Sequence, residues 1–167
     1  MALTSEIRVK ITARQSASLD LGTRASTVTV EKALPFANGT LANQADLVWS
    51  DERTLAASAT EDLDLAGVLT DAFGATITAA ELVAIYVEAA AANTNDVVVG
   101  DATAPIPLIG GTNGTVSVKP GGCFLLAAPG AAGQATIGAG ATDDLKISNS
   151  GSGTAVTFKI VILARSA

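Results

Sequence analysis

The chain has no histidine, a single cysteine and only 4% aromatic residues among its 167 positions. Without histidine, Ser-His-Asp and Cys-His catalytic arrangements are excluded, and the commonest side-chain metal ligand is missing. The lone cysteine, Cys123, cannot form a disulfide within the chain, which fits assembly in a reducing cytoplasm. Trp49 and Tyr86 each occur once, so the sequence offers no aromatic platform for stacking sugars or bases.

Charged residues make up only 16% of the sequence, against about 25% in an average soluble domain. The net charge of −6 disfavours binding to a nucleic-acid backbone, which needs dense Lys and Arg, so we expect no nucleic-acid partner. No apolar run reaches the 18 residues that a membrane-spanning helix needs. Residues 1–10 carry charges at alternating positions, which is not the pattern of a signal peptide. We therefore expect no membrane partner.

What the sequence does have is 49% hydrophobic residues, mostly small aliphatic ones, arranged with period two. Residues 6–12 place Ile7, Val9 and Ile11 on one face of a strand, with charged residues on the other. A similar run over residues 26–31 follows the break at Gly22, and the two runs predict an antiparallel pair ending near Pro35 and the Asn-Gly turn at residues 38–39. Residues 53–58 and 61–65 predict two short strands around a turn.

The residues from 82 to 87 are apolar throughout, which predicts a central strand buried on both faces. Thr78 and Glu81 have the spacing of a capping box, so at most one short helical turn is expected there. The alanines at 89–92 offer the alternative of a longer helix. The β-branched residues and Tyr86 in the middle of the run favour the strand.

Gly, Pro and Asn punctuate the second half, and strands are predicted between these breaks, at residues 97–99, 115–119, 123–127, 144–149 and 154–163. Residues 150–153 are interpreted as a hairpin tip. Short strands at regular spacing predict an all-β fold, a jelly-roll-like antiparallel β-sandwich or barrel with an N-terminal strand extension. We expect one domain over residues 1–167, in which residues 1–40 form N-terminal strands, a candidate interface or attachment arm, and residues 41–167 form the core.

Residues on the apolar side of each alternating or buried strand are expected to face a core or a subunit interface. They are Ile7, Val9, Ile11, Val28, Val30, Leu63, Leu65, Ile85, Val87, Val116, Val118, Leu125, Ile147, Phe158, Ile160 and Ile162.

Candidates for chemistry are few, and each has a simpler structural interpretation. The acidic pairs Asp62/Asp64 and Asp143/Asp144 are interpreted as solvated turn or edge residues in preference to a cation or acid-base site. The oxygen-rich run at residues 93–96, with Asp101, lacks the Gly and distal Glu of a calcium loop.

Cys123 starts an apolar strand with no basic neighbour in sequence, so it is predicted to be a buried, inert thiol. The glycines of residues 110–114 are not followed by the Lys-Ser/Thr pair of a phosphate loop, and consecutive turns explain them better. We therefore expect no catalytic residue, no cofactor and no metal.

Four segments of the sequence resemble small virion proteins of tailed bacteriophages. They lie at residues 49–67, 118–129, 144–151 and 156–166. The resemblance covers about residues 45–167. It lies in the pattern of strand and turn residues and not in a catalytic motif. It implies a jelly-roll head decoration (capsid cement) protein, made in the host cytoplasm and located on the outer surface of the head. In that role, homotrimers stabilise the shell of major capsid protein.

Two other roles stay open at this point. A tail, baseplate or fibre-tip module contacting the host surface would use a jelly roll equally well, although the long repetitive shaft of fibre proteins is missing. A small hydrolase would need the acidic pairs to converge on a cleft.

The N-terminal segment carries the residues expected to contact the capsid or another subunit. They are Ile7, Arg8, Val9, Lys10, Ile11, Arg14 and Arg24. The basic ones stand out in an acidic protein, and they represent either a solvated strand face or a contact with an acidic capsid surface. The strand at residues 5–12 is a candidate for adding to a neighbour's sheet.

Overall fold

A computed structural model describes residues 2–110 and 113–167 of the chain. Strands account for 55% of the residues and helices for 0%, which confirms the all-β prediction. The strands are β1 (Ser5–Leu19), β2 (Gly22–Phe36), β3 (Leu47–Leu55), β4 (Thr60–Asp64), β5 (Glu81–Ala89), β6 (Val97–Gly100), β7 (Thr115–Val118), β8 (Cys123–Ala127), β9 (Ala135–Thr136), β10 (Asp144–Asn149) and β11 (Val156–Arg165).

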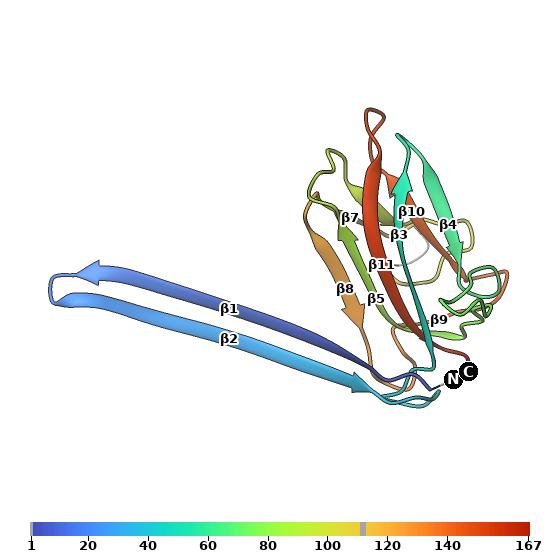
Figure 1. Cartoon of the computed structure of the whole chain (residues 1–167), viewed down its shortest axis with the longest axis horizontal. Helices are drawn as coiled ribbons and strands as arrows, with labels where there is room; N and C mark the ends of the chain where they lie inside the picture. Colours follow the sequence, from blue (N-terminus) through green and yellow to red (C-terminus); the bar gives the residue numbers. More distant parts are fainter. Residues whose placement is uncertain (1, 111–112) are drawn as a thin grey trace.

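The body is a sandwich of two antiparallel sheets, with strand orders β4-β10-β6-β7 and β3-β11-β5-β8, and β9 also pairs with β5 (Figure 1). Leaving β9 aside and counting from β3 along the chain, the sheets read 2-7-4-5 and 1-8-3-6, the order of a jelly roll. The predicted jelly-roll-like sandwich is therefore confirmed. Consecutive strands β10 and β11 lie in different sheets, so residues 150–153 connect the sheets, and the interpretation of a hairpin tip is wrong.

The core lies between the two sheets and is built from aliphatic side chains around Phe158 and Trp49. Nine of the predicted core residues are buried there: Leu63, Leu65, Ile85, Val87, Val118, Ile147, Phe158, Ile160 and Ile162. Val116 is half-buried against them. Leu125 is half-buried on the outer side of its sheet, because its neighbours Phe124 and Leu126 point inward.

Strand β5 is central and buried on both faces, as predicted. Leu82, Ile85 and Val87 belong to the main core, whereas Val83 and Ala84 belong to a second apolar cluster outside the sheet. The predicted capping box is wrong, because Glu81 is the first residue of β5 and its carboxylate pairs with Arg165. The alternative of a longer helix that extends from Thr78 through the alanines at 89–92 is also wrong. Residues 81–89 form β5, whose tertiary pairing overrides local helix preference, and a turn follows at residues 91–92.

Strands β1 and β2 form a separate two-stranded hairpin that projects from the body (Figure 1). Their register pairs Ser5 with Phe36 at the base and Leu19 with Gly22 at the tip, without interruption. Fifteen residues per strand, at about 3.4 Å each, give an arm about 50 Å long. At its tip Gly22 has φ 119°, a conformation that residues with a side chain rarely adopt.

The end of β11 fixes the base of this hairpin to the body. Arg165 is completely buried, and its guanidinium donates to the carbonyl oxygens of Gln44, Pro129, Gly130 and Ala131 as well as to Glu81. Because Gln44 follows β2, this side chain links the C-terminal strand, the loop after β8 and the segment that carries the arm.

Candidate functional site

All seven predicted contact residues lie on the projecting hairpin, six on β1 and Arg24 on β2. Ile7 lies at the base, where it packs half-buried against the second apolar cluster. Val9 and Ile11 point to the same side as Ile7 but are exposed, at 39% and 62%. Arg24 pairs with Ala17 and therefore shares this side too. The expected single basic cluster is thus divided between two faces.

Arg8, Lys10 and Arg14 occupy the opposite, polar face of the hairpin. Arg8 pairs with Glu6 at 2.8 Å, which raises the pKa of its guanidinium, mainly through their hydrogen bond. Lys10 lies 3.4 Å from Glu31. Both pairs are exposed, and solvent screening leaves such pairs little effect on stability. Among the described residues, no carboxylate lies within ion-pair distance of Arg14 or Arg24.

The tip of the hairpin carries two exposed leucines that sequence reasoning missed. Leu19 is about half-exposed, and Leu21, in the turn itself, is fully exposed. Turns usually hold Gly, Asn or Asp at such positions. The signal in the sequence was an apolar residue next to the Gly22 break, where polar residues are expected.

A groove of about 390 Å³ runs between the edge strands β3 and β4 of the two sheets. Asp62 and Asp64 line it together with Asp51 and Glu61, so the structure brings one predicted acidic pair toward other carboxylates. Arg53 occupies the same groove and pairs with Asp51 and Glu61. Its guanidinium also lies 5.3 Å from the ring centroid of buried Trp49, which leaves this ring no free stacking face.

The two residues of the second predicted acidic pair, Asp143 and Asp144, differ in their burial. The Asp143 side chain is buried and accepts a hydrogen bond from the backbone amide of Gly140, so its interpretation as a solvated residue is wrong. Asp144 lies opposite Asp64 in the pairing of β10 with β4. Burial raises the pKa of Asp144, with further contributions from Asp143, Asp62 and Asp64. Asp144 therefore belongs to a cluster of like charges that costs the fold stability at neutral pH.

The oxygen-rich run at residues 93–96 is used in hydrogen bonds within the protein. The Asn93 amide both donates to and accepts from the backbone of Thr157, and Asn95 donates to Asn149 and to the carbonyl of Thr154. Asp96 accepts from Lys119 at 2.6 Å. Within residues 2–110 and 113–167, no group of three His, Cys, Asp or Glu side chains is placed to hold a metal ion.

Cys123 is exposed, and the prediction of a buried thiol is wrong. Its strand alternates, and Phe124 and Leu126 take the core side, so Cys123 points outward. It lies opposite Glu88, whose carboxylate accepts a 2.6 Å hydrogen bond from the Tyr86 hydroxyl. This hydrogen bond, then burial and nearby negative charge, raise the pKa of Tyr86 to about 12.

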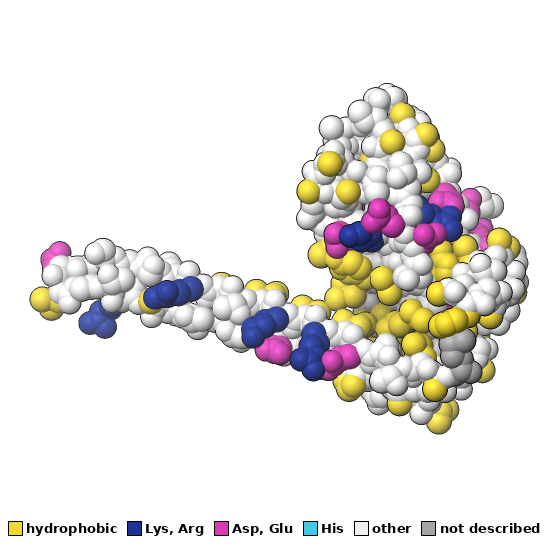
Figure 2. Space-filling view, viewed as in Figure 1, with side chains coloured by type: hydrophobic (Ala, Val, Ile, Leu, Met, Phe, Trp, Pro, Cys, Tyr) yellow, Lys and Arg dark blue, Asp and Glu magenta, His cyan; other side chains and the backbone are white. Residues whose placement is uncertain are grey.

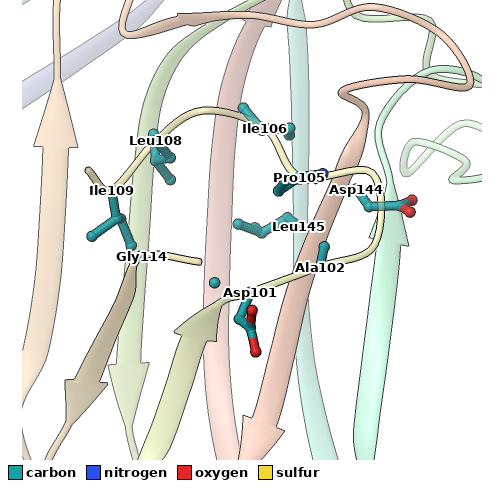
Figure 3. A pocket seen from close by; sticks show the side chains of 10 residues that line it. Asp101, Ala102, Pro105, Ile106, Leu108, Ile109, Gly114, Asp144 and Leu145 are labelled. Atoms are coloured by element: carbon teal, nitrogen blue, oxygen red, sulfur yellow. The ribbon is translucent and has the colours of Figure 1, made fainter. Parts of the chain in front are cut away.

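A small cavity of about 10 Å³, room for a single water, lies between the loop after β6 and strand β10. Its interior side chains are apolar, among them Ile106, Leu108 and Leu145 (Figure 3). The carboxylates of Asp101 and Asp144 point away from it (Figure 3). Of the glycine-rich segment 110–114 named in the sequence, residues 111 and 112 lie outside the described residues.

In comparisons with known proteins, no family model, curated protein or solved structure matches the chain. Within the described residues, no helix is long and apolar enough to cross a membrane.

Proposed function

We propose that this chain is a non-enzymatic virion structural protein, a decoration (cement) protein that sits as a homotrimer on the outer surface of a bacteriophage head. There it stabilises the shell of major capsid protein. The observation that carries the proposal is the projecting hairpin, whose aliphatic side chains beyond its base are exposed in the described chain. The jelly-roll body and the resemblance of residues 45–167 to small virion proteins support it.

The hairpin has the properties of an attachment arm. A two-stranded ribbon is marginally stable on its own in water, because one face of each strand has nothing to pack against. Here fifteen pairs project from the body, and Ile11, Val28 and Val30 are each about 60% exposed. An arm of this kind is stabilised when it binds a partner, and a partner must cover the exposed aliphatic side chains.

The tip and the polar face of the arm are suited to contact the shell. Leu21 is fully exposed at the far end, where it can insert into an apolar pocket. Arg14, half-way along the polar face, is available for an acidic capsid surface. Among the described strands β1 pairs with β2 alone, so its outer edge, at residues 5–12, can also add a strand to a neighbouring sheet.

The non-enzymatic part of the proposal is supported by how the polar groups are used. The chain lacks histidine. Two carboxylates of the groove, those of Asp51 and Glu61, pair with Arg53. The run at residues 93–96 forms hydrogen bonds within the protein. If alanine at Asp62, Asp64, Asp143 and Asp144 abolished a lytic activity of the particle while leaving its stability intact, a hydrolase would replace this proposal.

The test is binding of the purified full-length chain to undecorated heads, measured by co-sedimentation. Leu21→Asp places a charge at the tip and should weaken binding at least about tenfold, because burying an unpaired carboxylate is unfavourable. Leu41→Asp places the same charge on an exposed leucine in the loop after β2, far from the tip, and is the matched control. No binding of the wild-type chain to heads, with binding to tails instead, would contradict head decoration and favour the tail or baseplate role.

A further inference from the structure

The projecting hairpin has one apolar and one polar face. Val9 lies opposite Lys32, Ile11 opposite Val30, and Ala13 opposite Val28. Directly opposite residues in an antiparallel pair point to the same side, so these side chains form one continuous face. The other face holds Arg8, Lys10, Arg14 and a row of threonines. We call the first one the apolar arm face: Val9, Ile11, Ala13, Val28 and Val30.

The body carries a second apolar surface, on the outer side of the sheet β3-β11-β5-β8. The strand registers align two rows of residues across all four strands. One row is Val48, Leu163, Ala84 and Ala127, and the next is Ser50, Val161, Tyr86 and Leu125. Val48 and Val161 are exposed, at 39% and 38%. We call these two rows the outer sheet patch.

The two surfaces meet at the base of the arm. Ile7, Leu34 and Phe36 lie on the same side of the hairpin as Ile11, and they pack against Ala84 and Leu163 of the outer sheet patch. Hydrophobic side chains accordingly gather in the angle between hairpin and body, below a row of charged ones (Figure 2). Beyond its base the hairpin leads away from the body (Figure 1), so it does not cover the rest of its own patch.

We propose that the apolar arm face of one copy lies on the outer sheet patch of a second copy, so that the subunits associate by exchanging arms. This inference rests on the self-association in the proposed function and names the surfaces that make it. The apolar arm face is exposed, and so are Val48 and Val161 of the outer sheet patch, whereas Ala84 and Leu163 of that patch are already covered by the base of the arm. The exposed parts of the two surfaces suit each other because both carry aliphatic side chains.

Charge favours a second copy as the occupant. Residues 1–40 hold five basic and three acidic residues, a net +2, whereas residues 41–167 hold five basic and thirteen acidic, a net −8. The next row of residues across the same sheet, beyond the outer sheet patch, holds Glu52, Lys159 and Glu88. Lys32 and Arg24 border the apolar arm face, so they would approach these carboxylates. An arm of one copy is thus attracted to the body of another.

The native thiol provides a direct test. Cys123 is exposed at the edge of the outer sheet patch, next to Leu125 on β8. Val28→Cys puts a second thiol on the apolar arm face, and Thr27→Cys puts it on the polar face of the same strand. Under mild oxidation, Val28→Cys should give covalent oligomers on non-reducing gels, several-fold more than Thr27→Cys. The wild-type chain and Val28→Cys combined with Cys123→Ser give the background.

Sedimentation velocity of the full-length chain gives the second readout. The wild type should associate, and Ile11→Lys or Val161→Lys should raise the dissociation constant at least about tenfold, because each places a charge in the interface. Thr12→Lys, on the polar arm face, should leave it unchanged. A monomeric wild type, or equal cross-linking of both cysteine variants, would overturn the proposal. If that monomer still bound heads, head decoration would stand and the apolar arm face would belong to the shell.

Discussion

Replacing Arg165 with methionine tests what holds the arm segment to the body. Methionine is close to arginine in volume but donates no hydrogen bond. The change removes the 2.7 Å pair with Glu81 and the hydrogen bonds to Gln44, Ala131 and Gly130, each 2.9 Å. Arg165 is fully buried, whereas the Glu81 side chain is 22% exposed. Water can therefore reach the carboxylate that is left behind but not all of the carbonyls.

Removing one partner of a buried ion pair costs about 3–5 kcal/mol, mostly because the remaining polar groups are left unsatisfied. For a chain of this size, that corresponds to a fall in melting temperature of about 6–20 °C. Circular dichroism during thermal and urea unfolding measures both quantities. Lys159→Met is the control, because Lys159 pairs with Glu52 at the surface, where both side chains are about 60% exposed, and its replacement should cost about 1 kcal/mol or less. Equal losses for the two variants would refute the reasoning.

Three further predictions follow from the environments of single residues. Tyr86, the only tyrosine, should titrate near pH 12 by ultraviolet absorbance, and Glu88→Gln should move this pKa down toward 10; an unchanged pKa would show that Glu88 is not the cause. Because the pKa of Asp144 is raised from 3.8, the stability linked to its carboxyl is present below pH 3.8 and is lost as the pH rises through the folded value. Asp144→Asn should therefore raise the melting temperature at pH 7, with the gain vanishing below pH 3.8, whereas a gain constant with pH would exclude an electrostatic origin. Phe158→Ala, in the centre of the core, should cost about 3–5 kcal/mol in urea unfolding, and a loss below 1 kcal/mol would mean that the core is not packed around this ring.

Much of the body could be predicted from the sequence, because strand periodicity is a local signal. Leu63 and Leu65 alternate with aspartates, and Ile160 and Ile162 alternate with outward residues, so their burial follows from period two. The periodicity of a sequence does not say which strands pair with one another in a sheet. Strands β10 and β11 are neighbours in the chain with a Gly/Ser connection, yet hydrogen bonds to distant strands place them in different sheets.

The candidate site was predicted in part. The period-two runs identify Ile7, Val9 and Ile11 as one face, but the sequence does not say whether that face meets a core or projects from the body. Cys123 was misjudged because apolar neighbours suggest burial, whereas strand parity decides which of them point inward. Arg165 had no signal at all, since its partners are carbonyl oxygens from loops far away in the chain.

The most direct test of head decoration is cryo-electron microscopy of particles from the source, with mass spectrometry to identify this chain and count its copies. The account predicts hundreds of copies, seen as three-fold protrusions on the outside of the head, with the β1-β2 hairpin reaching neighbouring subunits. A handful of copies at the tail, or a particle without this chain, would contradict it.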